Sequence, residues 1–186
     1  MTKLNIREFI RYKFLNSLFL GLSVGSIFVV YTPLNPSIYS IGGIALAVGI
    51  LLVARFYEKI MNIDSFFKIS LLVEIVILTV ILYFLFYPYS YKSALFVYSG
   101  YQLTFMFGSY LLRAETKIVK KDRLLTMIDS AKQFGYLIGM GISYIIYKSF
   151  EHFGIESKKD QVYDLHFLLI ICELLIIYFL IRSFKR

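Results

Sequence analysis

The sequence predicts an all-α membrane protein of six transmembrane helices, and three observations support this fold class. Hydrophobic residues make up 59% of the 186 residues and charged residues 17%, whereas a soluble domain is about 25% charged. The apolar residues form six long segments, and about 20 such residues are needed for one helical crossing of a bilayer. The basic residues fall mainly in every second connection. We predict one transmembrane domain, residues 1–186, whose spans one to six are 14–31, 38–56, 67–87, 92–112, 131–149 and 164–181.

The ends of these spans are marked by turn residues and by charge. Span one follows a basic stretch, as the apolar part of a signal peptide does. Its apolar run is too long, however, and no A-x-A cleavage site follows, so we expect it to stay uncleaved as the first transmembrane span. Pro33 and Pro36 lie between spans one and two, and Pro88 follows span three, so no proline interrupts a span. Cys172 in span six is the single cysteine, which excludes an intrachain disulfide.

The basic residues predict the orientation of the chain. Of the 20 Lys and Arg residues, all but Lys92, Lys148, Lys158 and Lys159 lie before span one, between spans two and three, between spans four and five, or after span six. The positive-inside rule then places both termini in the cytoplasm. Binding to nucleic acid is the competing interpretation of a basic chain, but it does not explain this alternation, so we predict the lipid bilayer and no nucleic acid as a partner.

Glycine content divides the spans into two kinds. Spans one, two, four and five contain glycines and spans three and six contain none. Small residues four apart stack on one helix face, where they let helix backbones approach closely in lipid. We therefore predict an inner group of spans one, two, four and five, with spans three and six facing lipid. The predicted helix-packing residues are Ser17, Gly21, Gly25, Gly100, Gly108, Ala131, Gly135, Gly139 and Ser143.

The order of the spans repeats after three. It runs small, small, bulky, and then again small, small, bulky. Spans three and six also share one glutamate each, Glu74 and Glu173, inside an aliphatic run. Because three crossings reverse the chain direction, this pattern predicts a 3+3 inverted repeat, as in secondary transporters.

Two stretches resemble one six-helix half of a major facilitator superfamily transporter. The basic stretch 113–123 and the glycine-rich stretch 135–141 resemble the family's fourth-to-fifth connection and fifth helix. After span two, Arg55 and Lys59 match the cytoplasmic loop motif of the family, and Arg113 begins the second matching stretch. Ala54 and Tyr57 depart from that motif, which has Asp and Gly there, and span five lacks the proline of the antiporter motif.

The resemblance implies a half-size transporter. A full member has two six-helix halves, so a chain with one half implies a homodimer that rebuilds the cavity between them. In that family the first and fourth helices line the cavity. The polar residues of spans one and four, namely Gln102, Thr104, Ser23 and Ser26, are therefore the cavity-lining candidates. The alternative for the hydroxyl groups is a hydrogen bond back to their own helix.

Two glutamates are the candidates for proton coupling or substrate contact. A charge inside a membrane is costly, so an ionisable residue there indicates a function. Glu173 lies near the middle of span six, and Glu74 lies nearer the cytoplasmic end of span three, where Lys68 could reach it. The alternative is a neutral glutamic acid that is hydrogen-bonded to a neighbouring helix.

Secondary-active transport of a small solute or ion, with the proton as candidate coupling ion, is the function that the sequence favours. One alternative is a small-molecule-binding subunit resembling the S-components of energy-coupling-factor transporters, which would dock through the small-residue face of span one. The other is a non-transporting partner of a larger membrane complex, which would dock through residues 113–123.

We predict no enzyme, no cofactor and no metal site. His152 and His166 lack ligands at metal-binding spacing, and neither a phosphate-binding loop nor a Ser-His-Asp motif occurs. Frequent Ile, Lys, Phe and Tyr suggest an AT-rich genome, so we expect a multi-pass protein of a bacterial inner (cytoplasmic) membrane.

Overall fold

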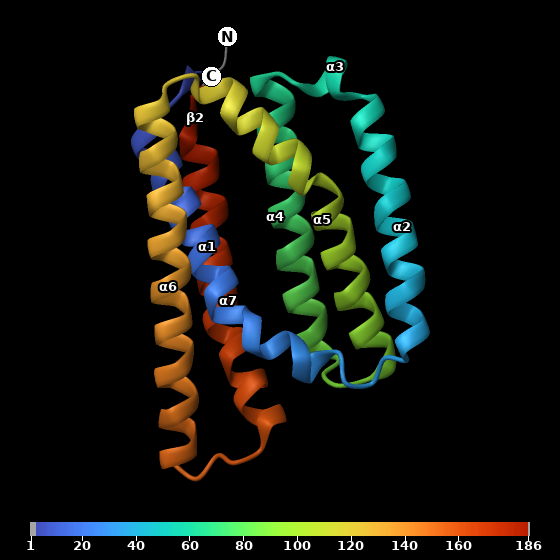
Figure 1. Ribbon diagram of the computed structural model, residues 1–186. Helices are drawn as coiled ribbons and strands as arrows, with labels where there is room; N and C mark the ends of the chain where they lie inside the picture. Colours follow the sequence, from blue (N-terminus) through green and yellow to red (C-terminus); the bar gives the residue numbers. More distant parts are fainter. Residues whose placement is uncertain (1–2, 186) are drawn as a thin grey trace.

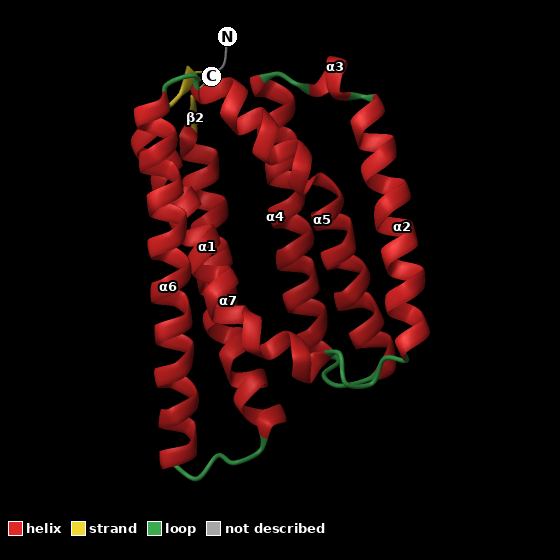
Figure 2. Cartoon of the chain, viewed as in Figure 1, coloured by secondary structure: helices red, strands yellow, loops and turns green. Residues whose placement is uncertain are grey.

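The computed structural model describes residues 3–185 and is almost entirely helical (Figures 1 and 2). Met1, Thr2 and Arg186 lie outside the described residues. The elements are β1 (Lys3–Leu4), α1 (Ile6–Val30), α2 (Pro36–Arg55), α3 (Tyr57–Ile60), α4 (Ile63–Phe86), α5 (Tyr91–Val119), α6 (Asp122–His152), α7 (Lys158–Ser183) and β2 (Phe184–Lys185). The all-helical fold class is confirmed, and each predicted span falls on one long helix.

Four of the described helices are long and apolar enough to cross a membrane, namely α1, α2, α4 and α7. They indicate a multi-pass membrane protein. Helices α5 and α6 contain the predicted spans four and five but are longer and more polar, with 29 and 31 residues. They are not among these four, so six crossings stay a prediction.

Local signals start and end the helices. Pro36 opens α2, where its missing N–H costs nothing. The side chain of Asn62 accepts a hydrogen bond from the N–H of Ser65 at 2.9 Å, and that of Ser90 accepts one from Ser93 at 3.0 Å. These side chains cap the first turns of α4 and α5.

The basic stretch 113–123 is helical almost throughout, which corrects the prediction that it forms a long connection. Helix α5 continues to Val119, and α6 begins at Asp122. Lys120, with φ of 57°, ends α5 in the left-handed conformation. The stretch contains neither Gly nor Pro, and charged residues such as Lys and Glu sustain a helix beyond its apolar part.

The six long helices stand in one row, in the order α6, α1, α7, α4, α5, α2, and each packs mainly on its neighbours in that row. Figure 1 shows α6 and α2 on opposite sides of the molecule. The middle of the row is the contact between α7 and α4. Side chains such as Ile77, Ile81 and Ile176 are buried there.

This order corrects the prediction that spans three and six face lipid. Helices α4 and α7, which hold those spans, lie at the centre of the row. In the most apolar stretch of each helix, 33% of the residues of α4 and 39% of those of α7 are buried, against 11% for α2. Bulky aliphatic side chains interdigitate at the density of a protein interior without any glycine. The absence of glycine therefore did not indicate the position of a helix.

The two ends of the chain meet at one end of the bundle. Strand β1 pairs antiparallel with β2, Lys3 with Lys185 and Leu4 with Phe184. Figure 1 shows the termini at the same end as α3, whereas the connections α1–α2, α4–α5 and α6–α7 lie at the other end. An even number of crossings requires this arrangement.

Candidate functional site

The middle of the helix row contains two buried acidic side chains. Glu74 on α4 and Glu173 on α7 are 2% and 1% exposed. They come from helices that pack against each other, and each carboxyl group lies within range of the other's charge. The structure therefore brings together two residues that the sequence identified separately.

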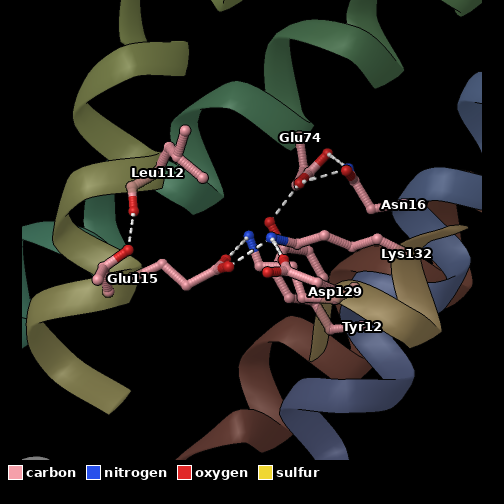
Figure 3. A network of polar contacts seen from close by, with 9 residues as sticks. Tyr12, Asn16, Glu74, Leu112, Glu115, Asp129 and Lys132 are labelled. Carbon is pink, nitrogen blue, oxygen red and sulfur yellow. Dashed lines mark hydrogen bonds and ion pairs between the residues drawn. The ribbon is translucent and has the colours of Figure 1, made fainter. Parts of the chain in front are cut away.

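Glu74 is held by two donors from α1. The hydroxyl of Tyr12 donates to Oε1 of Glu74 at 2.8 Å, and Nδ2 of Asn16 donates to Oε1 at 3.1 Å and to Oε2 at 3.4 Å (Figure 3). Tyr12 and Asn16 are four residues apart, so both project from the same face of α1. Two directed donors favour the ionised form of a carboxyl group.

Glu173 has a different environment. No hydrogen-bond donor among the described residues reaches either of its carboxyl oxygens. A buried carboxylate without a donor or a cation is costly, and two carboxylates near each other repel. The site is therefore suited to holding a proton on Glu173, beside a second buried carboxyl group.

A buried ion cluster lies next to this pair. Glu115 on α5 is 3% exposed and binds two lysines, Lys13 of α1 at 2.6 Å and Lys132 of α6. Lys132 also reaches Asp129 at 3.1 Å, and the side chain of Asp129 is 66% exposed. The cluster ties three helices together, and Figure 3 shows its Glu115, Lys132 and Asp129 beside Tyr12 and Glu74.

Polar groups thus continue from the buried pair to the surface. Lys13 follows Tyr12 directly in α1, and its Nζ lies 5.2 Å from the centre of the Tyr12 ring. Tyr12, Asn16 and Glu115 were not among the candidates drawn from the sequence. The signal that could have found them is a set of polar side chains inside helices that pack together, and it requires knowing which helices pack.

The predicted cavity-lining residues behave in two ways. The hydroxyl groups of Ser23, Ser26 and Thr104 donate to carbonyl groups of their own helices, at 3.3, 2.7 and 2.8 Å. Gln102 lines an apolar cavity of about 360 Å³ between α2 and α5, and its Oε1 is buried without a hydrogen bond. Of the four candidates, Gln102 alone combines a cavity of this size with an unused polar atom.

The small residues of α1 and α6 face each other. A Cβ on Gly21, Gly135 or Gly139 would collide with backbone atoms of the opposite helix. Ser143 adds a hydrogen bond from its Oγ to the carbonyl oxygen of Leu22 at 3.2 Å.

The other predicted packing residues have different surroundings. A Cβ on Gly25 would lie 3.6 Å from the ring of Tyr147, one on Gly100 would collide with the side chain of Val80 of α4, and one on Gly108 would point into open space. Ser17 is half-buried on α1, and Ala131 lines a groove between α1, α6 and α7.

The residues of the cytoplasmic loop motif are spread over three helices. Arg55 ends α2, and Lys59 lies in the short helix α3, with both side chains exposed. Arg113 lies within α5, and its guanidinium carbon is 5.8 Å from the centre of the Tyr57 ring. Arg113 therefore contacts α3 from inside a helix rather than from a loop.

The histidines lie apart from the acidic pair. His166 is buried, with its Nδ1 2.6 Å from the carbonyl oxygen of Val162 and the centre of its ring 4.2 Å from that of the Phe84 ring, tilted by 33°. Within residues 3–185, no group of three or more His, Cys, Asp and Glu side chains is placed to hold a metal ion.

Comparison with known proteins adds no assignment, because no protein-family model, no curated protein and no solved structure matches this chain.

Proposed function

We propose that this chain is a secondary-active membrane transporter of a small solute, coupled to the movement of a proton. The observation that carries the proposal is the pair of buried carboxyl groups, Glu74 and Glu173, at the contact between the two central helices. Ionisable groups inside membrane proteins are expensive and mark ion or proton pathways.

The two glutamates have unequal roles. Glu74 receives hydrogen bonds from Tyr12 and Asn16, so it is the member of the pair better suited to carry a negative charge. Glu173 lacks such donors and carries the proton. Loss of that proton would place two negative charges side by side between α4 and α7. The repulsion would favour a second arrangement of these helices, which is what coupling requires.

The helix contacts support a 3+3 repeat. If the first three spans are exchanged with the last three, the contact of α1 with α6 becomes that of α5 with α2, and the contact of α1 with α7 becomes that of α5 with α4. The contact of α4 with α7 maps onto itself. Glu74 lies on α4 and Glu173 on α7, the two helices that this exchange swaps with each other, as expected for a site on the axis of an inverted repeat.

The end helices support a homodimer of half-size units, similar in plan to a major facilitator transporter. Helices α2 and α6 each pack chiefly on one neighbour and expose large apolar side chains, such as Ile44 and Leu51 on α2 and Leu137 and Tyr144 on α6. A second copy related by a two-fold axis would cover both edges at once. The small-residue face of α1 is already occupied by α6, which does not favour the docking mode of an S-component.

Proton flux in proteoliposomes tests the proposal. Vesicles that contain the purified protein and a trapped pH-sensitive dye are challenged with fractions of a metabolite extract. We expect at least one fraction to start a proton flux that Glu173→Gln abolishes. The matched control is Glu151→Gln, which changes an exposed glutamate paired with Lys148 at the end of α6. If no fraction moves protons faster than in protein-free vesicles, the proposal is wrong.

The mass of the protein in nanodiscs, measured by light scattering, tests the dimer separately. Two chains per particle are expected, and a strict monomer would remove the homodimer from the proposal without touching the acidic pair.

A further inference from the structure

A mainly apolar groove lies along α1 at the end of the bundle that holds the termini. Helices α6 and α7 both pack on α1 but have few contacts with each other. Helix α1 therefore forms the floor of this groove (a furrow between helices), and α6 and α7 form its walls. The groove has a volume of about 340 Å³ and is lined by Ile10, Arg11, Phe14, Leu15, Ala131 and Phe179.

One arginine lines this groove and two others lie near it. Arg11 is among the lining residues, Arg7 is four residues before it on α1, and Arg182 is three residues after the lining residue Phe179 on α7; all three side chains are exposed. The guanidinium carbon of Arg11 lies 5.8 Å from the centre of the Phe179 ring, so the charge stands directly over an apolar wall.

One carboxylate lies beside these arginines and offsets part of their charge. Glu8 accepts a hydrogen bond from Nη1 of Arg11 at 3.2 Å, and its charge also acts on Arg182. Arg182 in turn donates to the hydroxyl of Tyr178 at 2.6 Å. The side chain of Arg11 is still 52% exposed, so it retains donors for a further anion.

We propose that this groove binds an anionic phospholipid, with an acyl chain along the furrow and the headgroup phosphate at Arg11 and Arg182. Basic pockets between membrane helices on the cytoplasmic side suit anionic headgroups, and guanidinium groups bind phosphate oxygens in pairs. Arg11 precedes the predicted span one by three residues, which places its charge at the level of the headgroups. This inference does not depend on transport by Glu74 and Glu173.

A second groove in the same molecule provides the comparison. The cavity between α2 and α5 has a similar volume, about 360 Å³, and a mainly apolar lining, but no Lys or Arg is among its lining residues. An acyl chain alone would fill either groove. Only a ligand with a negative headgroup distinguishes them.

Native mass spectrometry of the detergent-purified full chain, titrated with phosphatidylglycerol or phosphatidylcholine, tests the proposal. We expect tighter binding of phosphatidylglycerol, weakened about five-fold by Arg11→Gln, since one basic residue near a surface contributes roughly that factor. Ala131→Leu, which fills the groove but keeps its charge, should also weaken this binding. The matched controls are Lys59→Gln, an exposed charge at the same end, and Ala45→Leu, which fills the α2–α5 cavity.

Three results would overturn the assignment. Equal binding of the two lipids would show that charge plays no part. Equal losses in Lys59→Gln and Arg11→Gln, or in Ala45→Leu and Ala131→Leu, would show that the effect is not local to this groove. Displacement of phosphatidylglycerol by inorganic phosphate would show a site for the headgroup alone, without the furrow.

Discussion

The contacts of α1 with α6 and of α5 with α2 occupy equivalent places at the two ends of the helix row, yet they are built differently. Gly21 and Gly139 bring the backbones of α1 and α6 together, so that a Cβ on Gly21 would lie 2.8 Å from the amide nitrogen of Met140. In the other contact, Gly42 is covered by the ring of Tyr98 and Gly49 by the end of Met106.

The difference shows that the cost of adding a side chain at a glycine depends on whether backbone or side-chain atoms cover it. Backbone cannot move aside for an added methyl group, whereas the end of a methionine side chain can. The α1–α6 contact is therefore a fixed scaffold. The α2–α5 contact is adaptable and contains a cavity of about 360 Å³.

Filling the tight contact should have the largest effect. We expect Gly139→Leu to destabilise the fold by more than about 3 kcal/mol, because the new side chain meets the backbone of α1 and overpacking alone costs 1–3 kcal/mol. The measurement is thermal unfolding in detergent. Gly141→Leu is the control on the same helix, since a Cβ on Gly141 would point into open space. Equal losses in the two variants would contradict the account.

The link between the two regions should be the next most sensitive. Glu115 joins α1 and α6 of the tight region to α5 of the adaptable one. We expect Glu115→Ala to cost about 3 kcal/mol, because it strands two partly buried lysines. Asp129→Asn, at the exposed end of the same cluster, should change stability by no more than about 0.5 kcal/mol. Denaturant unfolding checks both, and a neutral Glu115→Ala would mean that the cluster does not hold the helices together.

The smallest effect should come from the adaptable contact. Gly49→Ala meets only the flexible end of Met106, so we expect a loss below about 1 kcal/mol. The same substitution at Gly21 should cost at least twice as much. Adding Met106→Ala should remove whatever loss Gly49→Ala causes, as a double-mutant cycle would measure. A larger loss at Gly49 than at Gly21 would reverse the comparison.

The helices could be predicted from the sequence because membrane thickness sets the length of an apolar run. Their ends could not: α6 begins nine residues before the predicted span 131–149, since charged residues prolong a helix outside the apolar layer. Which helices pack could not be predicted either. Glycine spacing suggested that α4 and α7 were peripheral, whereas aliphatic side chains place them at the centre.

The site was predictable in part for a similar reason. Glu74 and Glu173 stand out because a carboxyl group inside an aliphatic run is unusual. Their meeting depends on the packing of α4 against α7, which hydropathy does not contain. Glu115 was missed because a glutamate in a basic stretch is typical of an exposed surface, and Tyr12 because a tyrosine at the start of a span is typical of the membrane interface.

The proposed coupling depends most on a proton carried by Glu173, beside Glu74. Infrared difference spectroscopy of the protein in nanodiscs, with the pH raised stepwise, observes the stretching band of a protonated carboxyl group directly. We predict such a band at neutral pH that Glu173→Gln removes, while Glu74→Gln and the exposed control Glu151→Gln keep it. A wild-type protein without the band, or a band that survives in Glu173→Gln, would contradict the central claim.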